Sequence, residues 1–113
     1  LTPSLTILQK RGYKVGLVTD GRMSGASGKI PAAIHLTPEA IEAGPIAQIR
    51  NGDIIRINCD KGTLELINFD EVSKRNPSTI ERKNTSSLGR RLFTIARKAV
   101  SSSEQGASFI LSD

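Results

Sequence analysis

The sequence predicts a mixed α/β domain, in which a small β-barrel or β-sandwich carries helices on its outside. Three observations favour this class: apolar runs are short and bounded by Gly or Pro, helical patterns lie near both ends, and a hairpin pattern lies between them. The regular strand–helix alternation of a doubly wound sheet does not occur in the sequence. With 113 residues, the chain is expected to form one domain.

The first third of the chain predicts a helix, a strand and a glycine-rich loop. Thr2 and Pro3 are typical of an N-cap and a first helical position, and the helix is expected to run to about Lys10. The apolar residues within 14–19 predict a short buried strand. The small apolar residues within 30–36 predict the end of a loop that enters a second strand.

The middle of the chain predicts a second helix start and a hairpin. Thr37 before Pro38 is expected to cap a helix that closes at Gly44 and Pro45. A turn at residues 51–53 then leads into an alternating stretch, which predicts a half-buried strand. The hairpin is expected to pair residues 53–59 with residues 63–67 through a turn at Lys61 and Gly62.

The last third of the chain is more polar. Residues 70–75 predict one helical turn, and residues 76–87 predict an exposed linker. Apolar residues then recur at helical spacing and predict a helix from Leu88 to about Ser102, with its basic residues on a solvated face. The apolar residues within 107–111 allow an edge strand.

Composition and charge limit the classes of function. The net charge is +5, but the Lys and Arg residues are spread along the chain with little aromatic interleaving, so nucleic-acid binding is not expected. No apolar run approaches the ~18 residues of a membrane span. The single cysteine, Cys59, excludes an internal disulfide and a self-contained Cys-based cluster, as expected for a cytoplasmic protein. Because the chain starts at Leu1 and its one Met is Met23, we expect it to be part of a longer protein.

The loop of residues 19–29 is the candidate functional segment. It combines three glycines with two serines, Ser24 and Ser27, and has the cations Arg22 and Lys29 near its two ends. Consecutive N–H groups in such a backbone can form a concave nest that binds an anion. It is not a Walker motif, because Ile30 follows Lys29. A tight structural turn is the alternative interpretation.

Three further residues are expected to have structural roles. Asp20 is expected to be an Asx-type cap for the turn at Gly21 rather than a ligand. His35 and Cys59 lie in apolar segments and are expected to be packed rather than reactive.

Residues 14–35 carry a specific motif, Thr-Asp-Gly-Arg-Met-Ser-Gly-Ala-Ser-Gly-Lys, with apolar flanks. This segment closely resembles the C-terminal domain of the dihydroxy-acid dehydratase and phosphogluconate dehydratase family, and its Met-Ser-Gly continuation resembles the phosphogluconate branch. The resemblance covers most of the chain, whereas the segment 68–87 departs from it. It continues through residues 37–40, 44–47, 50–56, 89–90, 92–93, 100–101 and 104–108.

The resemblance implies a swivelling β-barrel-like domain flanked by helices, here the C-terminal domain of a larger enzyme. That enzyme would be an iron–sulfur hydro-lyase that dehydrates 6-phosphogluconate to 2-keto-3-deoxy-6-phosphogluconate in the Entner–Doudoroff pathway of gluconate metabolism. The cluster and a divalent cation would be bound mainly by an N-terminal domain absent from this chain. The implied partners are a small anionic sugar acid, that N-terminal domain and a second copy in a homodimer. Residues 1–113 alone are expected to be inactive.

The resemblance also implies roles for the loop residues. Ser24 would be the base, acting as an alkoxide, and Arg22 would orient the substrate carboxylate or support that alkoxide; the alternative for Arg22 is a guanidinium that pins the loop. Ser27, Lys29 and Gly25 would bind substrate, with Ser27 and Lys29 at its phosphate. Two alternatives stay open: the same domain of a dihydroxy-acid or other sugar-acid dehydratase, and a non-catalytic anion-binding module.

Overall fold

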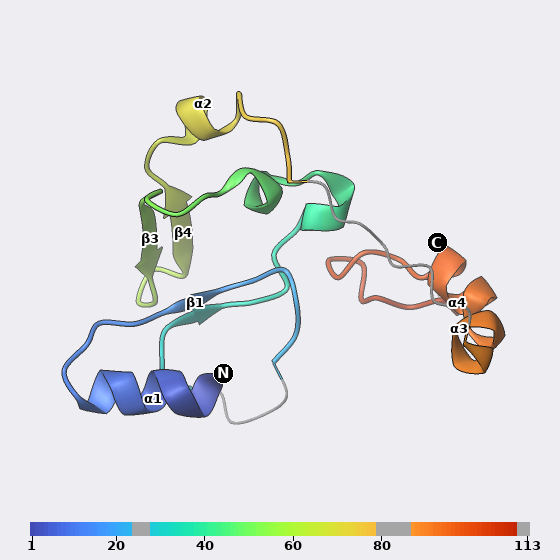
Figure 1. Cartoon of the computed structure of the whole chain (residues 1–113), viewed down its shortest axis with the longest axis horizontal. Helices are drawn as coiled ribbons and strands as arrows, with labels where there is room; N and C mark the ends of the chain where they lie inside the picture. Colours follow the sequence, from blue (N-terminus) through green and yellow to red (C-terminus); the bar gives the residue numbers. More distant parts are fainter. Residues whose placement is uncertain (24–27, 79–86, 111–113) are drawn as a thin grey trace. The chain divides into compact units, whose positions relative to one another are not determined.

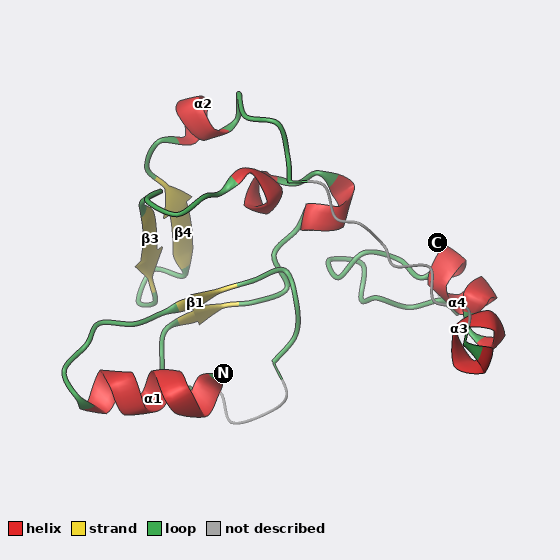
Figure 2. Cartoon of the chain, viewed as in Figure 1, coloured by secondary structure: helices red, strands yellow, loops and turns green. Residues whose placement is uncertain are grey.

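The computed structural model describes residues 1–23, 28–78 and 87–110 (Figure 1). The chain divides into two compact units, Leu1–Ser78 and Thr79–Asp113. Helices and strands both occur, which confirms the mixed α/β class (Figure 2). In chain order the elements are α1 (Thr2–Lys10), β1 (Leu17–Val18), β2 (Ala32–Ala33), η1 (Ala40–Glu42), η2 (Pro45–Gln48), β3 (Ile55–Asn58), β4 (Thr63–Leu66), α2 (Phe69–Val72), α3 (Leu88–Leu92) and α4 (Thr94–Ala99), where η marks a 3₁₀ helix.

The strands form two separate sheets of two strands each. β1 and β2 are parallel, with Leu17 opposite Ala32. β3 and β4 are antiparallel, with Ile55 opposite Leu66, and they confirm the predicted hairpin. In the described part of the chain these strands do not close into a barrel. The finer expectation of a barrel-like domain is therefore not seen in this chain.

Helix α1 ends at Lys10 as predicted but begins one residue earlier than predicted. Thr2 is its first residue, the N-cap is Leu1, and no side chain caps the helix. The expectation that Thr2 is the N-cap is therefore wrong. The Thr2 carbonyl accepts a hydrogen bond at 2.9 Å from the Thr6 hydroxyl, so both threonines belong to the first turns of the helix.

The second predicted helix is replaced by the two 3₁₀ segments η1 and η2. Thr37 does not cap it, because Glu39 is still extended at φ −65° and ψ 159°. Helical backbone therefore begins only at Ala40, and it ends at Ala43, whose φ of 57° is left-handed. Gly44, which follows, is buried.

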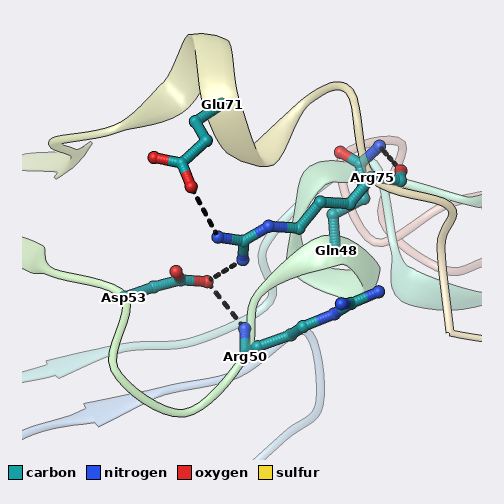
Figure 3. A network of polar contacts seen from close by, with 5 residues as sticks. All are labelled: Gln48, Arg50, Asp53, Glu71 and Arg75. Carbon is teal, nitrogen blue, oxygen red and sulfur yellow. Dashed lines mark hydrogen bonds and ion pairs between the residues drawn. The ribbon is translucent and has the colours of Figure 1, made fainter.

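A polar network joins the turn at residues 50–53 to the segment after α2 (Figure 3). One Asp53 carboxylate oxygen accepts hydrogen bonds from the Arg50 N–H and from the Arg75 guanidinium, both at 2.7 Å. The Arg75 and Asp53 side chains are only 21% and 8% exposed, and Glu71 lies 3.7 Å from the second guanidinium nitrogen. The Gln48 amide donates to the Arg75 carbonyl at 2.8 Å. Polar contacts thus join η2, the turn at residues 50–53, α2 and the chain after α2.

The described residues bury few hydrophobic side chains. Ile30 and Ala47 are 6% exposed and Val72 is fully buried. Large apolar side chains such as Ile54 (61% exposed) and Phe69 (51%) stay open to solvent. Burial of apolar surface is the main driving force of folding, so the first unit presents apolar surface that its own described residues do not cover.

The predicted helix from Leu88 to about Ser102 is two short helices, α3 and α4, with Phe93 between them at φ −92° and ψ 17°. Near the break the Arg90 carbonyl accepts hydrogen bonds from the Thr94 hydroxyl and from the Arg97 guanidinium. Side-chain bonds of this kind to a helix carbonyl often bend helices.

The tail differs from expectation as well. The described residues from Ala107 to Ile110 form no strand. The Ser101 N–H instead donates to the Ser108 carbonyl at 2.9 Å, which closes a loop on itself. Residues 76–78 are exposed, as the linker prediction required, while 79–86 lie outside the described residues. None of the described helices is long and apolar enough to cross a membrane.

We expect Gly44→Ala to destabilise the chain by at least the usual cost of overpacking, about 1–3 kcal/mol. A Cβ at this position would lie 1.9 Å from the Pro38 carbonyl oxygen. The control is Gly89→Ala in α3, where a Cβ meets nothing within 4 Å and Ala is the better helix former. Urea unfolding followed by circular dichroism measures both. A Gly44→Ala variant as stable as Gly89→Ala would show that the Pro38 carbonyl moves aside at little cost.

We expect part of the chain's stability to depend on Asp53 ionisation. The Arg75 guanidinium, followed by the Arg50 N–H, holds the pKa of the Asp53 carboxyl below its ordinary value of 3.8. A lowered folded pKa contributes stability that is fully present above the unfolded value and is lost as pH falls through the folded value. Asp53→Asn should therefore be less stable than wild type at pH 7, and the difference should vanish well below pH 3.8.

Arg75→Gln serves as the partner variant for this test. It removes the cation, so it should remove most of the same acid-dependent stability, while the Arg50 N–H still lowers the Asp53 pKa. The double variant should lose little more than Asp53→Asn alone. Thermal unfolding across the pH range checks all four proteins. A wild-type to Asp53→Asn difference that stays constant into acid would show that the ion pair is not its source.

Candidate active-site loop

The candidate loop connects β1 to β2. Parallel strands need a crossover of about a dozen residues, and the loop supplies it without an intervening helix in its described residues. The pairing is extended at both ends, because the Leu17 N–H donates to the Pro31 carbonyl and the Thr19 N–H to the Ala33 carbonyl, both at 3.0 Å. The two limbs of the loop therefore start and end beside each other.

The base of the loop is closed by further backbone bonds. The His35 N–H donates to the Gly21 carbonyl at 3.2 Å, and the Leu36 N–H donates to the Thr19 carbonyl at 3.3 Å. The Thr19 hydroxyl accepts the Gly21 N–H at 3.0 Å, which is a local side-chain turn. Residues 19–21 are thus fixed against residues 33–36.

Asp20 does not have the local role that the sequence suggested. Its Oδ2 accepts the backbone N–H of Ala40 at 2.8 Å, and Ala40 is the first residue of η1. The expected Asx-type cap for the Gly21 turn is wrong, because the Asp20 carboxylate bonds to this distant N–H and the Thr19 hydroxyl closes the local turn. The Ala40 N–H is available because the first N–H groups of a helix have no acceptor within the helix. No pattern in the sequence pointed to this contact.

The structure places two of the five predicted site residues. Arg22 and Lys29 lie on opposite limbs of the loop and both are exposed. The other three, Ser24, Gly25 and Ser27, lie outside the described residues. Their predicted roles, and any meeting of the five side chains, stay predictions.

The limb that carries Lys29 is held on both sides. The Lys29 carbonyl accepts a hydrogen bond at 3.0 Å from the Gln9 side chain of α1. The next residue, Ile30, is one of the few buried apolar side chains. Gly28, just before, has φ +92°, a conformation that favours glycine. The backbone under Lys29 is therefore fixed, while its ammonium side chain faces solvent.

His35 and Cys59 are not packed, so that expectation is wrong. His35 is exposed and has a left-handed φ of 56°. Cys59 is exposed in the turn that follows β3. Cys59 lies one position after β3 and His35 two positions after β2, where the alternating or apolar sequence continues beyond the regular backbone.

The described residues do not fit a metal cofactor. No three His, Cys, Asp or Glu side chains among them come close enough to hold a metal ion. The full chain contains one cysteine, whereas iron–sulfur clusters are held by several thiolates. Residues 1–113 thus lack the donor set of such a cluster.

The first unit also contains an apolar cavity of about 230 Å³. Its lining joins β1, the hairpin, η2 and α2, and it includes none of the predicted site residues. An anionic sugar acid would lose its hydration there without gaining hydrogen-bond partners, which is costly. The cavity is therefore unsuited to such a substrate. It is lined by Val18, Leu36, Thr37, Pro38, Pro45, Ile46, Ile49, Ile55, Leu64, Leu66 and Phe69.

Comparisons with known proteins agree with one another. The family described as dihydroxy-acid/6-phosphogluconate dehydratase C-terminal matches residues 1–107. The chain is 51% identical over 108 residues to a phosphogluconate dehydratase of Pseudomonas aeruginosa, covering 95% of this chain and 18% of that protein. It is 46% identical over 112 residues to the phosphogluconate dehydratase of Escherichia coli K12, covering 97% and 19%.

A dihydroxy-acid dehydratase of Methanosphaera stadtmanae is 43% identical over a shorter stretch of 76 residues, which is 66% of this chain and 14% of that protein. The chain thus spans less than a fifth of the length of these curated relatives.

Proposed function

We propose that the chain forms part of a hydro-lyase that converts 6-phosphogluconate to 2-keto-3-deoxy-6-phosphogluconate. It belongs to the dihydroxy-acid/6-phosphogluconate dehydratase family, whose C-terminal domain it matches over residues 1–107. The observation that carries the proposal is the near-complete alignment with relatives named phosphogluconate dehydratase. Because the chain spans less than a fifth of their length, the activity is proposed for the longer protein.

A second candidate is the dehydration of a non-phosphorylated dihydroxy acid. The relative with that name supports it, although it aligns over a smaller share of the chain. The two functions share the chemistry at C2 and C3 of the acid and differ at the far end of the substrate, where only one carries a phosphate.

In the proposed reaction a base removes the proton on C2, next to the carboxylate, and the hydroxyl on C3 leaves as water. The resulting enol tautomerises to the 2-keto acid. We propose Ser24 as the base. A serine hydroxyl is a very weak acid, so its alkoxide needs electrostatic support. Arg22, two residues earlier and exposed, is suited to bind the substrate carboxylate or to support that alkoxide.

We assign the iron–sulfur cluster and the divalent cation of the proposed enzyme mainly to the N-terminal domain, because the full chain has one cysteine and the described residues hold no group of three His, Cys, Asp or Glu that could bind a metal ion. No residue of this chain is assigned to help the C3 hydroxyl leave. The longer protein is proposed to be a cytoplasmic homodimer in which this domain packs on its own N-terminal domain.

We propose that the swivelling β-barrel-like domain is completed by strands outside this chain. The apolar cavity supports this, because residues of both sheets line it, including Val18, Ile55 and Leu66. Among the described residues each sheet has two strands, and pairs of that size rarely stand alone in water. Additional strands would pair with open edges and cover the exposed apolar side chains.

The longer protein, loaded with its cluster, should dehydrate 6-phosphogluconate, and Ser24→Ala should lower kcat by about 10²–10⁴-fold, the usual contribution of a general base. Loss of a base acts on the transition state, so substrate affinity should change little. A coupled assay for the keto-deoxy product measures kcat and KM, and the visible spectrum checks that the variant keeps its cluster. Activity within a few-fold of wild type would reduce Ser24 to a turn residue.

Lys29→Ala should raise KM for 6-phosphogluconate by roughly 10- to 150-fold, because a charge-assisted bond to phosphate contributes ~1.5–3 kcal/mol. Activity on unphosphorylated gluconate should barely change. Lys61→Ala is the matched control, since it removes the same charge from an exposed turn of the hairpin. Equal losses on both substrates would assign Lys29 to the loop fold, and a preference for an unphosphorylated dihydroxy acid would favour the second candidate.

A further inference from the structure

A hydrogen bond between Asp20 and Ala40 connects the start of the candidate loop to η1. The carboxylate oxygen and the backbone nitrogen lie 2.8 Å apart. The two residues are 20 positions apart in sequence, so the bond joins the end of β1 to the beginning of η1. Asp20 is half-buried, which shields the bond from competing water.

We propose that Asp20 is a positioning residue for the loop: its carboxylate holds the loop's first limb on η1 and thereby fixes where the Arg22 side chain starts. This inference rests on the proposed dehydratase function only for its kinetic readout. The Thr19 and Gly21 carbonyls are already bonded to the Leu36 and His35 N–H groups. With Asp20 bonded as well, three consecutive residues before Arg22 are anchored.

The acceptor on η1 fits this role. Ala40 is the first residue of η1, and the first N–H groups of a helix have no acceptor within the helix, so the Asp20 carboxylate supplies one. The segment behind it is rigidly placed, because the Gly44 N–H donates to the Glu39 carbonyl at 3.0 Å and a Cβ on Gly44 would collide with Pro38. A carboxylate on a backbone N–H is a charge-assisted bond, stronger than a neutral one. Asp20 therefore bonds to a fixed partner.

A small displacement of the loop start would have a large kinetic effect. Misplacing a catalytic group by about 1 Å can cost ~10²-fold in rate. An alternative role for Asp20 is that of a metal ligand in the longer enzyme. The two roles differ in what they require: positioning needs an acceptor for the Ala40 N–H, which an amide oxygen also supplies, whereas ligation needs the charge of the carboxylate.

The experiment compares four variants of the longer, cluster-loaded enzyme: Asp20→Asn, Asp20→Ala, Ala40→Pro and the double variant Asp20→Ala/Ala40→Pro. Proline removes the donor without touching Asp20. It suits position 40, because Glu39 at φ −65° and ψ 159° has the extended backbone required before proline, and Ala40 is the first residue of a helix. Kinetics, metal content and hydrogen exchange of the Ala40 amide are measured on folded protein.

Asp20→Ala should lower kcat/KM by about 10–100-fold, while Asp20→Asn should stay within about fivefold of wild type because its amide oxygen still accepts the bond. Ala40→Pro should resemble Asp20→Ala, and the double variant should be no worse than either, since both remove one interaction. Iron and divalent-metal content should be unchanged, and the Ala40 amide should exchange faster in Asp20→Ala. A loss that is equal in Asp20→Asn and Asp20→Ala, a drop in metal content, or additive losses in the double variant would each overturn the proposal.

Failure of the proposed function has a different signature. In that case the wild-type enzyme itself dehydrates neither 6-phosphogluconate nor an unphosphorylated dihydroxy acid. The hydrogen exchange of the Ala40 amide still tests the hydrogen bond between Asp20 and Ala40. Slow exchange in wild type and Asp20→Asn with fast exchange in Asp20→Ala supports the positioning contact without reference to activity. Unchanged exchange in Asp20→Ala refutes it.

Discussion

The two-residue parallel pairing of β1 with β2 is the constraint on which the candidate site depends. It brings Leu17 beside Ala32 and sets both limbs of the loop at one place in the first unit. A ladder this short has few hydrogen bonds of its own. It is lengthened by the bonds of Thr19 and Gly21 to the chain beyond β2, and the limbs are tied outward by Asp20 to η1 and by Gln9 of α1 to the Lys29 carbonyl.

In its described residues the first unit buries few apolar side chains. Only Ile30, Ala47 and Val72 are buried hydrophobic residues among those described. The Asp53–Arg75 ion pair therefore helps to hold the first unit together, because it connects the turn before β3 to the chain after α2. An apolar cavity and exposed apolar side chains remain around this polar frame, and more polypeptide packed against them would supply the missing burial.

The elements that the sequence predicted well are those whose causes are local. Helix α1, the hairpin and the turn at Gly52 follow from proline placement, alternation and a glycine with φ +101°. The expectations that failed depended on competition. Thr37 did not cap because Glu39 stayed extended. The helix from Leu88 is interrupted at Phe93, near the Arg90 carbonyl that accepts two side-chain hydrogen bonds. Neither feature is visible in the spacing of apolar residues.

For the site, the motif predicted which residue types matter but not how they are held. Thr19 and Asp20 are adjacent, short and polar, so the sequence allows either side chain to close a local turn with the N–H two residues further on. The Thr19 hydroxyl closes such a turn on the Gly21 N–H, whereas the Asp20 carboxylate bonds to the Ala40 N–H, 20 residues away. The first half of the motif therefore builds the base of the loop, and the substrate roles that we propose belong to its second half, from Arg22 onward.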